Sequence, residues 1–438
     1  MNKKTIIIEI VIIVVLVIIL GTIIGVYINS KNTSSEKMTS SSMEMPEKPG
    51  ESSSSNVSHT GSTEISSDTT TNGESYTSTT GSQNALLVTG GTSTLTNPTI
   101  TKTGDSDGDD SDFYGTNAGV LVKEGTLNIN GGNITTSGSH ANAVFAYSNG
   151  TINISDTNIK TTSNNSGAIM VTGGGTLTAN NVTAETEGNS SAPIRSDRGG
   201  GNLTINGGTY TSHGTGSPVI YSTADITVNN SSLTSTASEG VVVEGKNSVT
   251  LNNTTLEATN TKLNGNSETY KAIFIYQSMS GDADVGTSSF TANNSKIVNN
   301  KGDIIFVTNT NTIIELENNE IINNDVAGAF LRVAAAKWGK SGSNGGTVTL
   351  NAKNQKIEGD IMVDSISTLE LSLKEGSEYI GKINNDNSAK SIKLTIDNSS
   401  KITLTGDTYV TSLEDEDTSY SNINFNGYKL YVNGKSIN

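Results

Sequence analysis

The sequence predicts an all-β chain, a right-handed parallel β-helix with three strands per coil, and three observations support this fold class. A pattern of alternating apolar and polar residues recurs about every 25 residues, and each copy contains a turn rich in Asn and Gly. The composition is also too polar for a thick core, because only 32% of the residues are hydrophobic and 5% are aromatic. A thin core repeated along a rod suits this composition.

The first strand of the repeat is clearest in residues 127–134, with the sequence Leu-Asn-Ile-Asn-Gly-Gly-Asn-Ile. Leu127 and Ile129 alternate with Asn128, so the apolar side chains of this strand should face inward. The Asn-Gly pair suits a left-handed backbone and bends the chain into a second short strand that ends at Ile134. Further copies begin at Ile152, Leu177, Leu203, Ile226, Val249, Phe290 and Ile314, with weaker ones near Val348, Leu369 and Ile392.

A third apolar run precedes each copy, as in residues 144–146 and 169–171. Three strands per turn predict a triangular coil, and stacking pairs each strand in parallel with its neighbour about 4.8 Å away. An antiparallel sandwich is the alternative fold, but it does not explain a period near 25 that stays in register. Residues 425–432 are expected to cap the last coil.

The chain divides into three regions. Residues 1–29 are expected to form an N-terminal transmembrane signal anchor, because Ile6 to Ile28 is an almost uninterrupted apolar run long enough to span a bilayer. A cleaved signal peptide is the alternative, but no small-x-small cleavage site follows the run. Residues 30–84 are rich in Ser, Thr and Gly and are expected to be a disordered tether, followed by the β-helix over residues 85–438. This order predicts a single-pass protein of the cell membrane with most of the chain outside the cell.

The charge and the cysteine count exclude several kinds of partner and site. The formal net charge is −16, which repels phosphate backbones, so no nucleic-acid partner is expected. There is no Cys, so neither a disulfide framework nor a thiolate metal site can form.

Five segments carry a resemblance to a known family. They are Ser196–Gly201, Ser217–Asp225, Gly240–Lys246, Tyr276–Asp284 and Asn426–Gly434. Together they resemble adhesin-like, membrane-anchored β-helix proteins from the surfaces of Gram-positive bacteria and methanogens, over roughly residues 86–438. The resemblance implies a right-handed, pectate-lyase-like β-helix at the cell surface, and it assigns no activity to particular residues.

Two groups of charged residues are candidates for chemistry. Asp105, Asp107 and Asp109 share one loop at a spacing with which oxygen ligands surround Ca²⁺, although the sequence is not an EF-hand and a solvated acidic loop is the alternative. Arg195 and Asp197 share a turn, and a structural ion pair is favoured there over the arginine site of a polysaccharide lyase. No catalytic residue is assigned.

The outward positions of the third strand predict an apolar stripe. If Val144 and its equivalents face inward, the outward positions are Phe145, Met170, Arg195 and Ile220. Such a stripe must either bind a partner or be covered by loops. We therefore treat these four residues as candidates for ligand binding, with coverage by the insertions as the alternative.

Two insertions, residues 260–288 and 324–346, hold aromatic and acidic residues that suit carbohydrate. Insertions of a solenoid often lie on one face, and aromatic rings beside carboxylates and amides bind sugar rings. The candidate residues are Tyr270, Tyr276, Asp282, Asp284 and Trp338. A surface adhesin or display scaffold that contacts a glycan or a surface protein without turnover is the favoured function. A polysaccharide lyase or glycoside hydrolase and a purely structural coat protein are the alternatives.

Overall fold

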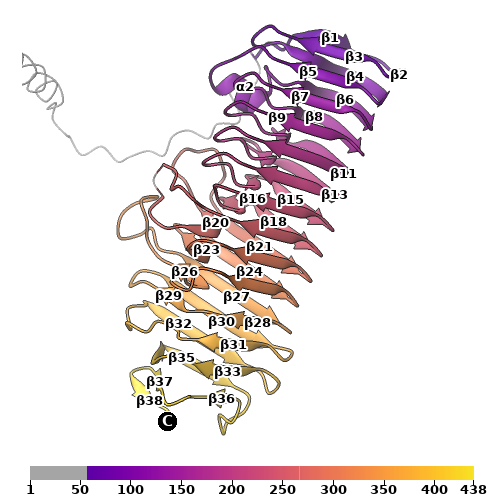
Figure 1. Ribbon diagram of the computed structural model, residues 1–438. Helices are drawn as coiled ribbons and strands as arrows, with labels where there is room; N and C mark the ends of the chain where they lie inside the picture. The colour runs from indigo at the N-terminus through magenta and orange to yellow at the C-terminus, as the bar shows by residue number, and fades with distance from the viewer. Residues whose placement is uncertain (1–56, 266) are drawn as a thin grey trace, which may run out of the picture. The chain divides into compact units, whose positions relative to one another are not determined.

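The computed structural model describes residues 57–265 and 267–438, which form a parallel β-solenoid of the right-handed type with about 15 coils (Figure 1). The fold class expected from the repeat is therefore confirmed. The expected anchor over residues 1–29 and the tether over residues 30–56 lie outside the described residues. Within the described part, no helix has the length and apolar character needed to cross a membrane.

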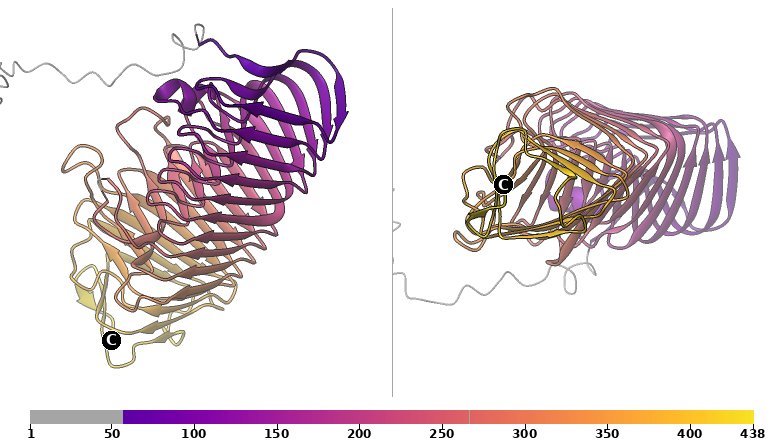
Figure 2. Two further views of the ribbon diagram at one scale, coloured as in Figure 1. Left: turned by 45° about the horizontal axis from the view of Figure 1, so that its top comes forward. Right: turned by 90° about the horizontal axis from the view of Figure 1, so that it is seen from below.

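Each coil contributes strands to three faces, and strands of successive coils lie side by side along the stack (Figure 2). Face 1 carries the Leu127-type strands: β2 (Thr69–Asn72), β4 (Asn84–Thr96), β6 (Val120–Asn130), β8 (Val144–Ser155), β11 (Gly175–Thr186), β13 (Gly201–Ser212), β15 (Asp225–Asn229), β18 (Ser248–Asn252), β21 (Thr287–Asn293), β24 (Asn311–Glu317), β27 (Thr347–Lys353), β30 (Thr368–Lys374), β32 (Ser391–Ile396) and β35 (Ser412–Asp415).

Face 2 follows face 1 after one corner, and the long strands β11 and β13 continue onto it. Its other strands are β3 (Ser75–Ser78), β5 (Thr99–Lys102), β7 (Asn133–Thr136), β9 (Asn158–Thr161), β16 (Ser232–Ser235), β19 (Thr255–Ala258), β22 (Lys296–Asn299), β25 (Glu320–Asn323), β28 (Lys356–Glu358), β31 (Glu378–Gly381), β33 (Lys401–Leu404) and β36 (Ile423–Asn424).

Face 3 carries the Val144-type strands, and the first parts of β4, β6 and β8 belong to it. Its other strands are β1 (Gly61–Ile65), β10 (Ile169–Thr172), β12 (Ile194–Ser196), β14 (Ile220–Ser222), β17 (Val241–Glu244), β20 (Lys271–Tyr276), β23 (Asp303–Thr308), β26 (Leu331–Val333), β29 (Ile361–Val363), β34 (Thr408–Val410) and β37 (Leu430–Val432). A short helix, α2 (Asp109–Tyr114), and a last strand, β38 (Lys435–Ser436), complete the described elements.

The register between coils is the one that the repeat predicts. Leu127 pairs with Ile152, and the pairing continues through Leu177 to Leu203. One copy is displaced, because the partner of Ile314 is Leu350, two residues beyond the expected start of that copy. A shift of two residues keeps every side chain on its expected side of the strand, so the inward pattern survives.

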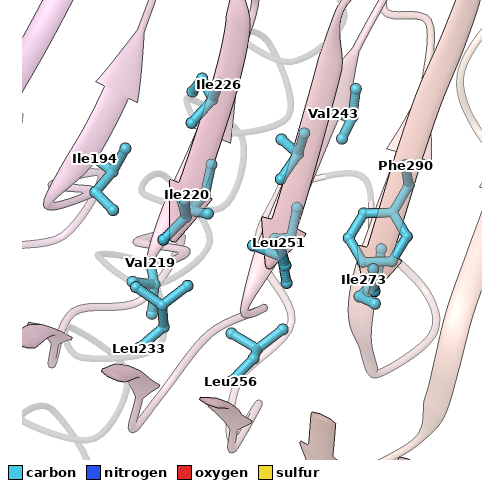
Figure 3. Close-up of a cluster of buried hydrophobic side chains, with 14 of the residues drawn as sticks. Ile194, Val219, Ile220, Ile226, Leu233, Val243, Leu251, Leu256, Ile273 and Phe290 are labelled. Carbon is cyan, nitrogen blue, oxygen red and sulfur yellow. The ribbon is translucent and has the colours of Figure 1, made fainter. Parts of the chain in front are cut away.

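The inward side chains of the three faces form one continuous core along the rod. Ile194, Ile226, Leu251 and Phe290 lie within it, and each is at most 1% exposed (Figure 3). A core only one side chain deep on each face explains how so polar a chain can fold.

The corner between faces 1 and 2 explains the recurrent Asn. One residue at this corner has a left-handed backbone in successive coils, including Asn181 (φ 52°), Asn253 (φ 50°) and Asn294 (φ 49°), and Gly131 and Gly207 serve in other coils. Asn and Gly are the residues that adopt this conformation at least cost. The turn predicted from the Asn-rich sequence is therefore confirmed.

The expected boundary between tether and β-helix is wrong. The first coil consists of β1, β2 and β3, so the solenoid begins at Gly61 and not at residue 85. Its apolar content is low, and Ile65 and Tyr76 are the side chains that it adds to the core. The segment is ordered because its strands pair with β4 and β5, which supplies the stabilisation that composition alone does not indicate.

At the C-terminal end, β37 pairs in parallel with β34 and antiparallel with β38. Leu430 of β37 is fully buried. The antiparallel strand covers the free edge of β37, which is the role expected of a cap.

Phe290→Ala should lower the free energy of unfolding by about 3–5 kcal/mol, because the ring is fully buried and its loss leaves a cavity between coils. The adjacent Thr291→Ala, which changes an outward side chain of the same strand, should cost less than about 0.5 kcal/mol. Urea denaturation followed by circular dichroism measures both. Equal effects of the two substitutions would contradict the inward and outward assignment.

Candidate functional site

The outward positions of face 3 form the stripe expected from the sequence, with one correction. Phe145 pairs with Met170, and Met170 pairs with Arg195. Arg195 then pairs with Tyr221, whereas Ile220 pairs with Ile194 and points into the core (Figure 3). The expected outward position of Ile220 is therefore wrong.

The first part of the stripe is buried. Phe145 and Met170 are 0% exposed, and they pack with Leu121 and Tyr147 beneath Tyr114 of α2. The helix and its loop therefore cover this part of face 3. Phe145 and Met170 therefore do not form an exposed ligand surface, and the segment that covers them is α2 and not one of the two insertions.

The two long insertions meet over the second part of the stripe. Trp338 lies 5.1 Å from the ring of Phe274 and 5.2 Å from that of Tyr276, and Phe274 lies 5.7 Å from Phe306. We call these four residues the aromatic cluster. Tyr270, in contrast, lies apart from it, with its ring 5.8 Å from the ammonium of Lys301.

A buried carboxylate anchors the insertion to face 3. Glu244, which is 1% exposed, accepts hydrogen bonds from the hydroxyls of Tyr221 (2.6 Å), Tyr276 (2.8 Å) and Ser278. Burial raises the pKa of both phenols well above its usual value, and the carboxylate of Glu244 adds to the rise. Both tyrosines are therefore neutral donors that hold Glu244 in place.

Next to Glu244 lie two arginine–aspartate pairs. The Arg195 guanidinium donates to Asp197 (3.0 Å), and Arg198 donates to Asp282 (2.5 Å). Burial raises the pKa of Asp197 to about 6, and Arg195 opposes the rise while Asp282 and Glu244 add to it. Carboxylates and cations from neighbouring coils thus gather on one face. Each of these charged side chains is already hydrogen-bonded to another side chain of the group or to a tyrosine.

A buried lysine–glutamate pair lies beneath the aromatic cluster. Lys271, which is fully buried, contacts Glu239 at 3.2 Å, donates to Ser267 and lies 4.3 Å from the ring of Phe274. Burial lowers the pKa of Lys271, and Glu239 opposes this effect. The cavity beside them has a volume of about 110 Å³. This volume is well below the roughly 300 Å³ at which ligand pockets begin.

A larger cleft lies beside the loop that connects β20 to β21, and we call it the Gln277 cleft. Its volume is about 650 Å³. The lining consists of Gln277, Val285, Gly286, Asn309, Thr310, Asn311, Gly342, Ser343, Gly345, Thr347, Ser365, Ile366 and Lys390. Both insertions contribute to it, and so do the corners of three further coils.

Gln277 is the least satisfied polar group of this cleft. The residue is 6% exposed, its amide nitrogen donates to the carbonyls of Ser278 and Ala283, and its Oε1 has no hydrogen-bond partner among the described residues. A buried acceptor without a donor costs about 1–3 kcal/mol. A ligand hydroxyl that reached this oxygen would remove that cost.

Asp284 lies on the other side of the same loop. It forms an ion pair with Lys246 at 2.8 Å. A smaller cleft of about 290 Å³ runs past Asp282 and Asp284, and glycines 199–201 form part of its wall. Asp282 and Asp284 thus line the same cleft, and each forms an ion pair with a cation, Arg198 and Lys246 respectively.

The three aspartates expected to bind Ca²⁺ do not converge. Asp105 accepts a hydrogen bond from the Ser139 amide, Asp109 lies 3.9 Å from Arg198, and Asp107 is exposed. In the described part of the chain, the one group of three carboxylate and imidazole side chains whose ligand atoms approach one another is Glu185, Glu187 and His213. Lys160 already contacts both glutamates there, at 3.2 and 3.1 Å.

Comparison with protein-family models, with curated proteins and with solved structures finds no match for this chain.

The sequence indicated part of this arrangement. It suggested that the two insertions would lie on one face, and Tyr276 and Trp338 do meet, with their rings 5.2 Å apart. Glu244 and the Gln277 cleft were missed. The role of Glu244 could have been inferred from the run Val241–Glu244, in which it is the one charged residue. A carboxylate at the end of such an apolar run needs buried hydrogen-bond donors.

Asp197→Asn should remove a pH-dependent contribution to stability between about pH 4 and pH 6. The pKa of Asp197 is about 6 in the folded chain and about 3.9 when unfolded, so the folded chain binds more protons in this window. Asp197 therefore makes the wild type less stable as the pH rises. The melting temperature of wild type minus that of the variant should fall from pH 4 to pH 6.

Asp397→Asn is the matched control with the opposite sign. Although partial burial opposes it, hydrogen bonds from the Glu375 amide and from Ser399 and Ser400 lower the pKa of Asp397 to about 2. The melting temperature of the wild type minus that of Asp397→Asn should therefore rise as the pH increases, and this rise should occur below about pH 4. A flat difference for Asp197→Asn between pH 4 and pH 6 would show that its pKa is not raised.

Proposed function

We propose that this chain is a membrane-anchored surface scaffold that binds a neutral carbohydrate in the Gln277 cleft without turnover. The observation that carries the proposal is the lining of that cleft, which joins amide and hydroxyl side chains to a buried acceptor without a partner. Its volume of about 650 Å³ lies within the range of ligand pockets.

The composition of the lining favours a neutral sugar over an acidic one. Asn309, Asn311 and Thr347 offer both donors and acceptors, which match the hydroxyls of a sugar ring. Lys390 is the one charged residue of the lining, so a polyanionic glycan would find little compensation there. The net charge of −16 also repels polyanions.

The surface location rests on the sequence. The apolar run from Ile6 to Ile28 and the Ser/Thr-rich segment after it suit an anchor and a spacer. The resemblance to adhesin-like surface proteins points the same way. A rod held away from a membrane would present its clefts to other surfaces.

A polysaccharide lyase or glycoside hydrolase is the second candidate, and one observation favours it. Asp197, Glu244 and Asp282 gather on neighbouring coils beside two arginines, and a carboxyl with a pKa of about 6 can act as a general acid. Against it, Glu244 and Asp197 are buried and engaged in hydrogen bonds. Binding without turnover therefore fits the geometry better.

The full chain, solubilised in detergent, should bind neutral glycans on a glycan array, with and without added Ca²⁺. Asn311→Ala should weaken binding about three- to tenfold, as expected for one lost hydrogen bond. Asn351→Ala is the matched control, because Asn351 lies on the next coil of face 1 and outside the cleft. No binding by the wild type, or equal losses in both variants, would leave the structural coat protein as the better interpretation.

Turnover is tested on any glycan that the array identifies. We expect no new reducing ends and no unsaturated products after incubation with the full chain. Product formation that Asp197→Asn abolishes would instead establish the enzyme.

A further inference from the structure

Face 1 carries a regular array of short polar side chains that belongs to none of the clefts described above. Five successive strands form it, β11, β13, β15, β18 and β21, and they lie side by side along the rod (Figure 1). Each strand presents three outward positions, so the array consists of three ranks that run from coil to coil. In every rank, the residues of neighbouring coils are paired in register.

The middle rank is a line of five threonines, Thr178, Thr204, Thr227, Thr250 and Thr291. Each side chain is half-exposed, and the five hydroxyls have no hydrogen-bond partner among the described residues. Neighbours in the line are about 4.8 Å apart, the distance between paired strands. Because a β-branched side chain has few rotamers, the line presents its methyl and hydroxyl groups with little loss of entropy.

The last rank is a ladder of asparagines that keeps the strands aligned. The side-chain amide of Asn206 donates to Asn180 (3.0 Å), and bonds of 2.9 Å continue the ladder through Asn229 and Asn252 to Asn293. Side-chain ladders stabilise flat sheets of many strands. The asparagine ladder therefore supports a flat surface around the threonine line.

The array is almost free of charge. Asp225, in the first rank, is the one charged side chain of the three ranks, and it accepts a hydrogen bond from Ser248 (2.6 Å). The formal net charge of the chain is nevertheless −16, and face 2 of the same coils carries Glu185 and Glu257 at outward positions. The three strands before β11 continue the array with Thr, Asn and Ser, also without a charge.

The array also lacks the groups that recognise proteins and sugars. Its first rank consists of Thr176, Asn202, Asp225, Ser248 and Ser289, so no aromatic or aliphatic side chain occurs in any of the three ranks. Protein interfaces and sugar sites depend on such side chains. A flat, uncharged and periodic surface instead suits a ligand that is itself flat, uncharged and periodic.

We propose that this array binds the surface of an ice crystal. A water molecule of ice both donates and accepts hydrogen bonds, as the threonine hydroxyl does. The threonine line orders a layer of water at the spacing of the strands, and this layer joins the crystal. The contacts act together because the ranks are in register, and the rigid sheet loses little entropy on binding. The array shares no residue with the Gln277 cleft, so this proposal is independent of glycan binding.

The full chain in detergent micelles should enter a slowly growing ice crystal, and it should hold the freezing point below the melting point. Detergent alone and serum albumin are the blanks for both measurements. Serum albumin should be excluded from the ice, and neither blank should separate the two temperatures.

Thr227→Tyr should abolish both effects, because a ring in the middle of the line holds the surrounding array away from the crystal. Tyr suits an outward strand position, and circular dichroism checks that the variant is folded. Thr234→Tyr is the matched control and should keep both effects, since Thr234 is an outward threonine of the same coil on face 2. Thr204→Tyr, one coil earlier in the line, should act like Thr227→Tyr.

Two results would overturn the proposal. One is exclusion of the wild-type chain from ice, and the other is an equal loss of activity in Thr227→Tyr and Thr234→Tyr. Exclusion from ice together with binding to microcrystalline cellulose that Thr227→Tyr abolishes would assign the array to a crystalline polysaccharide instead.

Discussion

The structure depends on one interaction, the parallel hydrogen-bond ladder between each coil and the next. With 32% hydrophobic residues and no Cys, the chain has neither a thick core nor cross-links, so the stacked backbone carries the fold. The first coil shows this most directly. It adds little more than Ile65 and Tyr76 to the core, yet it is built like the others because β4 and β5 offer their edges. The composition predicted a disordered segment there. The prediction was wrong because composition does not describe the hydrogen bonds that a neighbouring strand supplies.

The periodic part of the fold could be predicted because each coil repeats the same physical solution. An inward apolar residue, an outward polar residue and an Asn or Gly in a left-handed corner recur in the sequence, and the strands and corners of the structure follow this pattern. Where two adjacent apolar residues could each occupy the inward position, the alternation of apolar and polar residues does not determine which one faces the core. Val219 and Ile220 are both buried, and the coil from Ile194 to Ile220 has one residue more than the one before it. The outward position therefore belongs to Tyr221, whose hydroxyl reaches Glu244.

The candidate sites could be predicted only in part, because they lie where the repeat is broken. The sequence indicated that insertions would carry the aromatic residues, and Trp338 and Tyr276 do meet over Phe274. It did not indicate that α2 would cover Phe145 and Met170, since a six-residue helix in an acidic loop has no periodic signal. Nor could it indicate the Gln277 cleft, whose lining comes from segments far apart in the sequence.

A solenoid is uniform along its length, so its clefts arise where one coil departs from the next. On face 3 the insertions add residues to the coil. They cover part of the stripe, and clefts lie on either side of the loop between β20 and β21. Face 2 departs by removing residues, which leaves β25 without its next neighbour and opens the core at Ile321. The side chain that accepts the backbone N–H at the corner between faces 1 and 2 lengthens from Ser295 through Asn319 to Gln355 in successive coils. β25 and β28 do not pair because the next coil crosses face 2 with fewer residues, and Gln355 satisfies the Asn319 amide at the corner where the two paths diverge.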